Sequence, residues 1–336
     1  MRIAWCCKWL PPEGTDAVEA TAMNLRGTTV TALMRLSPAA AAARLLALVC
    51  ANLDALQAQI AATMARPVVE RAMRIGSEVL PLYTHPIARP HYAQPSLRAP
   101  IEHGLAAAGR LARAAGVRLS MHPGQFTVLA TKSENALSGT IEEIEYHTEV
   151  MRLLGHAGGW HPHGAHINVQ AGAKAPGIEV FRTNFALLSE DARGLLTVEN
   201  DEVSYGLGDL LPLADALPIV LDLHHHWLHS EGEHIAPDDR RLDQVRSSWR
   251  GVRPVAHIST SRRELMPHWP EDRLPDLAAL LAAGLKVRDL RAHSDRMWNR
   301  AVNNWAAAHL AWADLEIEAK GKNLASAEFA AGLGLA

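Results

Sequence analysis

The stretch Ile219-Val220-Leu221-Asp222-Leu223-His224-His225-His226-Trp227 joins an apolar run of strand length to a sudden cluster of ligand-forming side chains. A short apolar run of this kind is typical of a strand buried in a parallel sheet. Asp222 and the histidines come at its end, and carboxylate together with imidazole suits divalent ions such as manganese, iron or zinc. The stretch therefore predicts a buried strand whose end supplies Asp222 and at least one histidine to a metal ion.

Seven further apolar segments have the length of a strand. They are Ile3–Cys6, Ala72–Ile75, Val117–Met121, Ala165–Val169, Leu195–Val198, Val255–Ile258 and Leu315–Ile317. Most are separated by helical patterns, such as Ile101–Ala115, Ile141–Leu154 and Asp276–Ala283. Alternating strands and helices indicate a parallel sheet with covered faces, and eight strands over about 320 residues predict a single (β/α)8 TIM barrel. A doubly wound open sheet is the alternative, which the lack of a glycine-rich fingerprint after the first strand disfavours.

We expect a single domain over residues 1–336. Apolar residues at helical spacing predict a long helix over 37–66, between the first two strands, and the residues from about 323 onward are expected to form a C-terminal tail. The most apolar stretch, Ala39–Leu53, contains Arg44 and is too short to span a bilayer. The first residues lack a charged region followed by an apolar core, so we expect no signal peptide and a cytoplasmic protein.

The composition is that of an ordinary globular protein, with 48% hydrophobic and 21% charged residues. The net charge of −3 provides no overall positive field for nucleic acid. Only six of the 33 basic residues are lysine, a bias that a GC-rich genome produces and that phosphate recognition also favours. Three cysteines without framework spacing indicate a reducing compartment.

Side chains that can bind a metal stand at or near the ends of most of the expected strands. They are His122, His166, Glu199, Asp222, His225, His257 and Glu318, with His293 in a charged segment before the last strand. Because the carboxyl ends of barrel strands converge on one mouth, we expect these side chains to meet there. Each of them alone is equally well explained as a surface charge or a core histidine, but the ordered set favours a metal centre. Glu199, which directly follows its apolar strand, is the best candidate for a bridging carboxylate.

Other catalytic chemistries find less support. The sequence contains no GxSxG elbow and no Walker loop. Cys6 and Cys7 lie near the end of the first strand, where we interpret them as structural, since a buried cysteine behaves as a small hydrophobic residue.

Several of these stretches together resemble the UV damage endonuclease family of the UvdE or UvsE type. They are Arg74-Ile75-Gly76-Ser77, Arg118-Leu119-Ser120-Met121-His122-Pro123-Gly124-Gln125, Val198-Glu199-Asn200-Asp201-Glu202, Asp222-Leu223-His224-His225, His257-Ile258-Ser259, Arg291-Ala292-His293 and Glu318-Ala319-Lys320-Gly321-Lys322. They follow the family order across nearly the whole chain, and the HPGQ and EAKGK stretches are the most specific.

The resemblance implies a TIM barrel related to endonuclease IV, with up to three divalent metals per chain. Manganese is the expected ion, and zinc, cobalt and magnesium are the other candidates. On the matching positions the first metal would be held by His122, His166 and Glu199. Glu199 would bridge to a second metal, held also by Asp222, His257 and Glu318. A third would belong to His225 and His293, and the catalytic residues would be Glu199, His257 and Glu318.

The resemblance also implies contacts with DNA. Gln125 and Phe126 match the pair that enters the duplex at the lesion, although the family usually has tyrosine where Phe126 stands. The other expected DNA contacts are made by Trp5, Arg74, Lys320 and Lys322. A lysine that is carboxylated in studied members and lies at the metal site is replaced here by Val255.

The expected function is that of a metal-dependent DNA repair endonuclease, which uses metal-activated water to cut 5′ to UV photoproducts and other distorting lesions. Its partner would be damaged double-stranded DNA; we expect a monomer with no membrane association and no obligatory protein partner. One alternative is a sugar isomerase or epimerase, since related barrels have similar mouths and fold alone does not distinguish the two. A non-catalytic relative that binds distorted DNA is the other, and Val255 is the feature that favours it.

Overall fold

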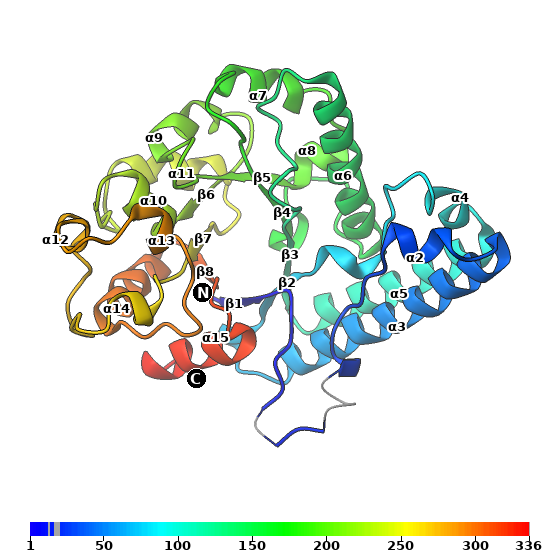
Figure 1. The fold of residues 1–336 in the computed structure, drawn as a ribbon, viewed down its shortest axis with the longest axis horizontal. Coiled ribbons are helices and arrows are strands. Elements are labelled where there is room, and N and C mark those ends of the chain that lie inside the picture. Colours follow the sequence, from blue (N-terminus) through cyan, green and yellow to red (C-terminus); the bar gives the residue numbers. More distant parts are fainter. Residues whose placement is uncertain (13, 17–20, 336) are drawn as a thin grey trace.

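The computed structural model describes residues 1–12, 14–16 and 21–335. Its strands pair in parallel in the order β1 to β8, and β8 pairs with β1, so that a closed barrel lies inside a ring of helices (Figure 1). The strands are β1 Ile3–Cys6, β2 Ala72–Ile75, β3 Arg118–Met121, β4 His166–Gln170, β5 Leu196–Glu199, β6 Ile219–Asp222, β7 Val255–Ile258 and β8 Asp314–Ile317. The predicted (β/α)8 barrel is confirmed, and each predicted strand is present to within a residue or so at either end.

The helices fill the connections between the strands. They are α2 Val30–Met34, α3 Pro38–Met64, α4 Arg89–Tyr92, α5 Pro95–Ala114, α6 Glu134–Leu153, α7 Ile178–Phe185, α8 Glu190–Leu195, α9 Leu207–Leu210, α10 Leu223–His229, α11 Arg241–Ser248, α12 Leu277–Ala282, α13 Val287–Leu290, α14 Arg300–Ala308 and α15 Lys322–Gly332. Short 3-10 turns are η1 Val68–Glu70, η2 Ser77–Val79, η3 Pro162–Gly164, η4 Leu211–Leu213, η5 Arg263–Leu265 and η6 His309–Ala311.

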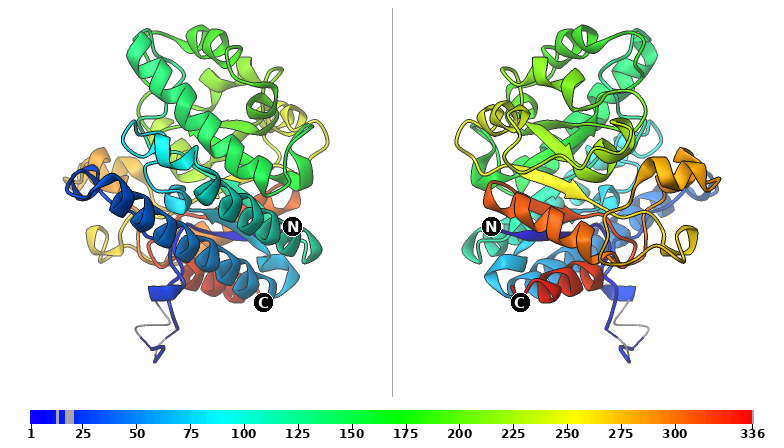
Figure 2. Two further views of the ribbon diagram at one scale, coloured as in Figure 1. Left: turned by 90° about the vertical axis from the view of Figure 1, so that its right-hand side faces the viewer. Right: turned by 90° about the vertical axis from the view of Figure 1, so that its left-hand side faces the viewer.

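Helix α3 covers the barrel between β1 and β2 and lies beside α5 (Figure 2). Ser37 caps its first turn by accepting a hydrogen bond from the Ala40 N–H, and Pro38 opens the helix. By length and composition it is the one helix among the described residues that could cross a membrane, and its 27 residues exceed the apolar stretch that the sequence indicated. Its Leu45, Val49 and Leu56 are fully buried in the hydrophobic core that the helices share with the barrel.

Helix α5 approaches the end of α6 so closely that no side chain fits at Gly109. A Cβ atom there would lie 1.8 Å from the carbonyl oxygen of Leu154. We expect Gly109→Ala to lower the free energy of unfolding by about 1–3 kcal/mol, because the helices must separate. Gly139 in α6 is the matched control, since a Cβ there meets nothing within 4 Å and Gly139→Ala should raise stability by up to about 1 kcal/mol. Urea unfolding measures both, and equal stability of the two variants would contradict the close packing.

The C-terminal residues do not form the expected tail. Residues 322–332 form helix α15, which packs against β1 and brings the two chain ends to the same side of the molecule (Figure 2). Asn323 is fully buried and exchanges two hydrogen bonds with the backbone of Leu10, at 2.6 and 2.9 Å. The sequence underestimates this helix because its apolar residues are small alanines, so that its buried face gives only a weak pattern.

Candidate metal centre

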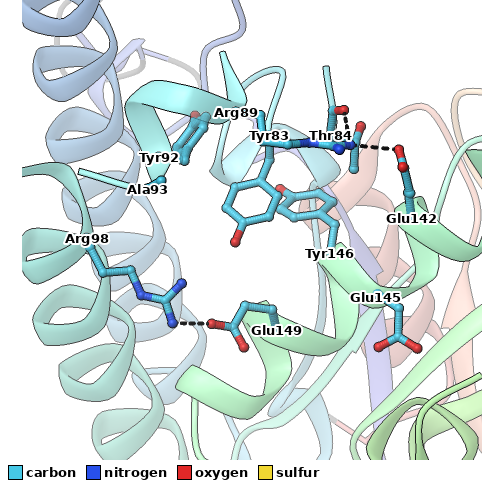
Figure 3. Close-up of a pocket in the computed structure, with 10 residues that line it drawn as sticks. All are labelled: Tyr83, Thr84, Arg89, Tyr92, Ala93, Arg98, Glu142, Glu145, Tyr146 and Glu149. Carbon is cyan, nitrogen blue, oxygen red and sulfur yellow. Dashed lines mark hydrogen bonds and ion pairs between the residues drawn. The ribbon is translucent and has the colours of Figure 1, made fainter. Parts of the chain in front are cut away.

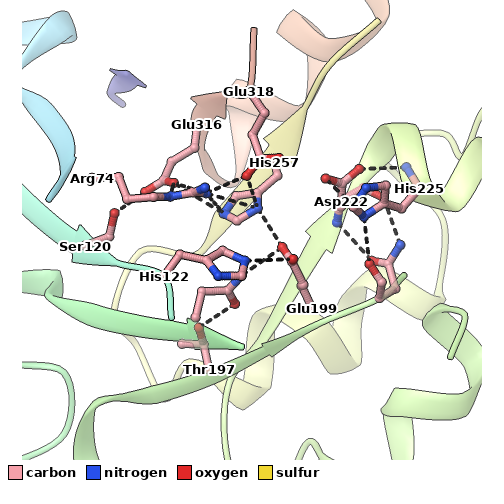
Figure 4. Close-up of polar contacts among 12 residues, drawn as sticks. Arg74, Ser120, His122, Thr197, Glu199, Asp222, His225, His257, Glu316 and Glu318 are labelled. Carbon is pink, nitrogen blue, oxygen red and sulfur yellow. Dashed lines mark hydrogen bonds and ion pairs between the residues drawn. The ribbon is translucent and has the colours of Figure 1, made fainter. Parts of the chain in front are cut away.

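Three acidic and imidazole side chains meet at the carboxyl ends of neighbouring strands in the barrel mouth. Glu199 ends β5, Asp222 ends β6 and His257 lies on β7 (Figure 4). One ligand atom from each lies within 4.8 Å of the others, all three residues are buried, and His257 Nδ1 is 2.7 Å from Glu199 Oε2. This is the grouping that the sequence predicts, and a carboxylate–imidazole set of this kind suits a borderline divalent ion.

The charges within this group fit a cation. Asp222 Oδ1 accepts a hydrogen bond from the His225 N–H at the start of α10, at 2.7 Å. Its Oδ2 is buried without a hydrogen-bond partner, 3.5 Å from His225 Nδ1. A buried carboxylate oxygen left unpaired costs free energy, and a metal ion would satisfy it. Burial, opposed by His225, raises the pKa of Asp222 above its usual value.

Glu199 is contacted on three sides, by His122, Asn168 and His257. His122 Nε2 lies 3.0 Å from Oε1, and Asn168 Nδ2 donates to Oε2 at 2.7 Å. Burial raises its pKa, but His122 and His257 outweigh this effect and hold the pKa well below the usual range. Glu199 is therefore an ionised carboxylate, as a bridging ligand must be.

His122 stands at the end of β3, beside Glu199, as predicted. Its Nδ1 lies 2.8 Å from the carbonyl oxygen of Pro123, a distance at which a proton on Nδ1 would form a hydrogen bond to that oxygen. Nε2 is then the acceptor nitrogen, and it faces a carboxylate. A cation between the imidazole and the carboxylate would satisfy both groups, so this contact fits a metal site.

His166 does not lie where the sequence places it. It begins β4 instead of ending it, its buried Nε2 has no hydrogen-bond partner, and the nearest carboxylate is Glu316, at 3.9 Å. Asn168, two residues further along, is the β4 side chain that reaches Glu199. Side chains two apart on a strand share a face, so the sequence identifies the correct face of β4 but not the layer within the barrel.

The sequence suggested Arg74, on β2, as a contact for DNA. The structure instead places its side chain inside the barrel mouth. Its side chain is buried, and its Nη2 lies 2.5 Å from Glu316 Oε2 and 2.7 Å from Glu318 Oε1. Glu316 is a residue that sequence reasoning missed. The alternation Leu315-Glu316-Ile317-Glu318 was the available signal, because it puts both acids on the inward face of β8.

Glu316 is ionised well below neutral pH. Burial raises its pKa, but Arg74 and His257 outweigh this and lower the pKa to about 2, and Ser120 Oγ also donates a hydrogen bond to its Oε1. In the unfolded chain the pKa of Glu316 is about 4.5, and in the folded protein it is about 2. The ionised carboxylate therefore stabilises the fold above pH 4.5, and this contribution is lost as the pH falls from 4.5 toward 2.

We therefore expect Glu316→Gln to flatten the acid side of the stability curve. Unfolding in EDTA, followed at pH 5 and at pH 3, should show a smaller loss of stability in Glu316→Gln than in the wild type. An identical loss in the two proteins would show that the ion pair with Arg74 does not form.

The remaining expected ligands line the other side of the mouth. Glu318 Oε1 is 3.3 Å from His257 Nδ1, and Oε2 is 3.9 Å from His293 Nδ1. The rings of His225 and His293 lie 6.1 Å apart. Burial lowers the pKa of His225, but Asp222 and Glu199 raise it to about 9, so a metal bound here has to displace a proton.

The expected DNA contacts separate into exposed and buried residues. Gln125 and Phe126 lie on the loop after β3, and Phe126 is 85% exposed. Lys320 is exposed, 3.8 Å from Asp295, and Lys322 is half-buried. Trp5 is fully buried and donates to Thr63 Oγ1 at 3.2 Å, so its expected role in stacking on a base is wrong. Trp5 faces away from the barrel interior and is buried against α3, whereas its neighbour Cys6 points inward toward Glu316.

Val255, the position where the related family has lysine, is buried on β7. It packs with Val220 and Trp249 in a small apolar cluster below His257. The guanidinium of Arg118 lies over the Trp249 ring of this cluster, 5.4 Å from the ring centre.

A separate pocket of about 510 Å³ lies outside the mouth, between α4, α5 and α6 (Figure 3). Its charges pair with one another: Arg98 with Glu149 at 2.6 Å, and Arg89 with Glu142 at 2.8 Å. The Tyr146 hydroxyl in its wall donates to the Ser77 carbonyl at 2.7 Å. The mouth, in contrast, holds a group of three potential metal ligands in which Asp222 Oδ2 has no hydrogen-bond partner, so we place the functional site there.

Comparison with known proteins agrees with this geometry. The family model described as UV-endonuclease UvdE matches residues 15–334. A UV-damage endonuclease of Neurospora crassa is 32% identical over 202 residues, which cover 56% of this chain and 30% of that protein. A UV-damage endonuclease of Schizosaccharomyces pombe is 29% identical over 253 residues, 68% of this chain and 35% of that protein.

A bacterial relative and a solved structure are also similar. A UV DNA damage endonuclease of Bacillus mycoides is 29% identical over 199 residues, 57% of this chain and 59% of that protein. The chain thus spans about a third of the fungal relatives and little more than half of the bacterial one. The crystal structure of SacUVDE superposes with a TM-score of 0.74 at 20% identity over the whole of both chains, which supports the fold.

Proposed function

This chain belongs to the UV-endonuclease UvdE family, and from that premise we propose that it is a metal-dependent DNA repair endonuclease. Its substrate would be double-stranded DNA with UV photoproducts or other distorting lesions, cut on the 5′ side, and its place of action the cytoplasm. The observation that carries this proposal is the buried group of Glu199, Asp222 and His257 with an unpartnered Asp222 oxygen. A cation is the one ligand that this combination of charge and burial favours.

The residues of the mouth have separate tasks in this proposal. Glu199, Asp222 and His257 would hold a divalent ion, with manganese as the first candidate, and Glu318, His122, His225 and His293 stand around them. When bound, such an ion supplies Lewis-acid activation of water and of the phosphodiester. Glu318 Oε1 lies 3.3 Å from His257 Nδ1, so this carboxylate would stand beside the bound ion, in position to accept a proton from the attacking water.

Recognition would depend on the shape of the damaged duplex. A lesion lowers the cost of opening a base step, and Phe126, with Gln125 beside it, is exposed and free to enter the gap. Lys320 and Lys322 come two and four residues after Glu318, where they would reach a DNA backbone that passes over the mouth. Phosphate contacts of this kind fix the position of the duplex without reading its sequence.

Nicking of supercoiled plasmid tests the proposal. UV-irradiated plasmid should be converted to the open circle in manganese, while unirradiated plasmid and reactions in EDTA remain supercoiled. Manganese-independent nicking, or equal nicking of both plasmids, would contradict it. If irradiated DNA is bound but not cut with manganese, cobalt, zinc or magnesium, the protein is a binding relative; if neither occurs and a ketose is epimerised, it is a sugar enzyme.

A further inference from the structure

All six lysines of the chain lie at the same end of the barrel, although they are far apart in sequence. Each comes after the end of a strand, in the segments that surround the mouth of a barrel. Even Lys286, in the long connection after β7, belongs to a segment that reaches the mouth, because Arg291 pairs there with Glu202 at 2.9 Å. We call the six residues the lysine rim; they are Lys8 after β1, Lys132 after β3, Lys174 after β4, Lys286 after β7, and Lys320 and Lys322 after β8.

This placement differs from what helix propensity favours. Lysine is a strong helix former that suits exposed helix positions, yet no lysine lies within α2 to α14, and only Lys322 belongs to a helix, as the first residue of α15. Arginine, the far more frequent basic residue, lies at both ends of the barrel. At the end away from the mouth, Arg71 donates to the carbonyl oxygen of Ala115 at 3.2 Å, and Arg253 donates to that of Ala313 at 2.7 Å. Arginines there tie the barrel together, whereas lysine is kept for the rim of the mouth.

The ammonium groups of the lysine rim are largely free of partners. Five of the six side chains are exposed, and Lys322 is half-buried. Lys174 Nζ lies 4.0 Å from Asp209 and Lys320 Nζ lies 3.8 Å from Asp295, while the other lysines form no ion pair with any residue that the structure describes. Long, exposed ion pairs contribute little, so these charges are available to a ligand from solution.

We propose that the lysine rim binds the phosphate backbone of duplex DNA on both sides of the mouth. In the closed barrel β3 and β4 stand opposite β7 and β8, so lysines flank the mouth from two directions, as a duplex lying across it requires. An ammonium on a flexible stem is a mobile point charge that meets phosphates without reading bases. The inference rests on the proposed function for the identity of the polyanion, and it adds Lys8, Lys132, Lys174 and Lys286 to the DNA contacts. The rim then supplies affinity for damaged and undamaged duplex alike, and Phe126 supplies the preference for the lesion.

Chemical modification of the lysines is the first test. Acetylation removes their charge, whereas reductive dimethylation keeps it, and neither reaction alters arginine. In fluorescence anisotropy with an undamaged duplex at low salt, acetylated protein should lose affinity by about 10²-fold or more, and dimethylated protein should bind as untreated protein does. Mn²⁺ binding should survive both treatments, because the group of Glu199, Asp222 and His257 contains no lysine. Equal affinity of acetylated and untreated protein, or no duplex binding by untreated protein, would overturn the proposal.

Paired variants test the position of the charges. Each lysine–phosphate contact contributes about 0.9 to the slope of log affinity against log salt concentration. The double variant Lys132→Gln/Lys174→Gln should therefore lower that slope by roughly two and weaken binding to every duplex equally. The matched control, Arg110→Gln/Arg152→Gln, removes the same charge from two exposed arginines near the ends of α5 and α6, away from the mouth, and should leave the slope unchanged. The same slope in both double variants would show that the rim does not contact DNA.

These results are independent of the nuclease assay. A protein whose duplex affinity depends on lysine charge, but which does not nick irradiated DNA, would support the lysine rim and contradict the proposed function. Manganese-dependent nicking of irradiated DNA that is undiminished after acetylation would do the reverse.

Discussion

Replacement of Glu199 by glutamine is expected to abolish incision of irradiated DNA, with a loss of about 10²–10³-fold or more. Glu199 is buried in the mouth, with Oε1 3.0 Å from His122 Nε2 and Oε2 2.7 Å from His257 Nδ1. An amide at this position removes the negative charge that a metal ligand needs. The amide also replaces one acceptor oxygen with an N–H₂ group, which cannot accept the hydrogen bond that Asn168 donates to Glu199. We therefore expect Mn²⁺ affinity and incision to fall together.

Glu142→Gln is the matched control for this variant. Glu142 is an exposed carboxylate of α6 that pairs with Arg89 on the outside of the barrel, at 2.8 Å. Incision by this variant should remain within about twofold of the wild type, because exposed ion pairs contribute little. If Glu199→Gln incises irradiated DNA as fast as Glu142→Gln does, the chemistry lies outside the mouth.

Replacement of Phe126 by alanine is expected to weaken the preference for damaged DNA. Stacking of one base on an aromatic ring contributes about 1–3 kcal/mol, so the affinity for a photoproduct duplex should fall on the order of 10-fold or more. Because Phe126 is 85% exposed, its removal should leave the free energy of unfolding and the Mn²⁺ affinity unchanged. Fluorescence anisotropy with damaged and undamaged duplexes separates this effect from general DNA binding.

Leu187→Ala is the control for exposed apolar area. Leu187 is 60% exposed and lies between α7 and α8, on a segment that leads into the start of β5 and away from the mouth. Its loss should not change DNA affinity. If both variants bind the two duplexes as the wild type does, Phe126 does not enter the lesion.

The order of the strands and much of the mouth could be predicted from sequence, for a specific physical reason. Strands buried on both faces are continuous apolar runs, so β6 and β7 stand out, and β7 has the predicted ends, Val255–Ile258. A polar side chain at the end of such a run has to face the mouth. This reasoning places Glu199, Asp222 and His257 together.

Depth within the barrel could not be predicted in the same way. Trp5 faces the helix layer outside β1, while Arg74 and His166, although on strands that the sequence identifies, lie deeper in the barrel than expected. Their level depends on the register between strands, such as Ser120 opposite His166, and register follows from closure of the whole barrel. The pairing of Arg74 on β2 with Glu316 on β8 likewise joins residues that only the closed barrel brings together.

Mapping the cut on a duplex with one photoproduct tests the proposed function most directly. An end-labelled duplex that contains a single pyrimidine dimer should be cut once, at the phosphodiester immediately 5′ to the lesion. The cut should depend on Mn²⁺, be lost in EDTA and in Glu199→Gln, and be absent from the undamaged duplex. A cut on the 3′ side, cuts scattered along both duplexes, or undiminished cutting by Glu199→Gln would contradict a lesion-directed endonuclease centred on the barrel mouth.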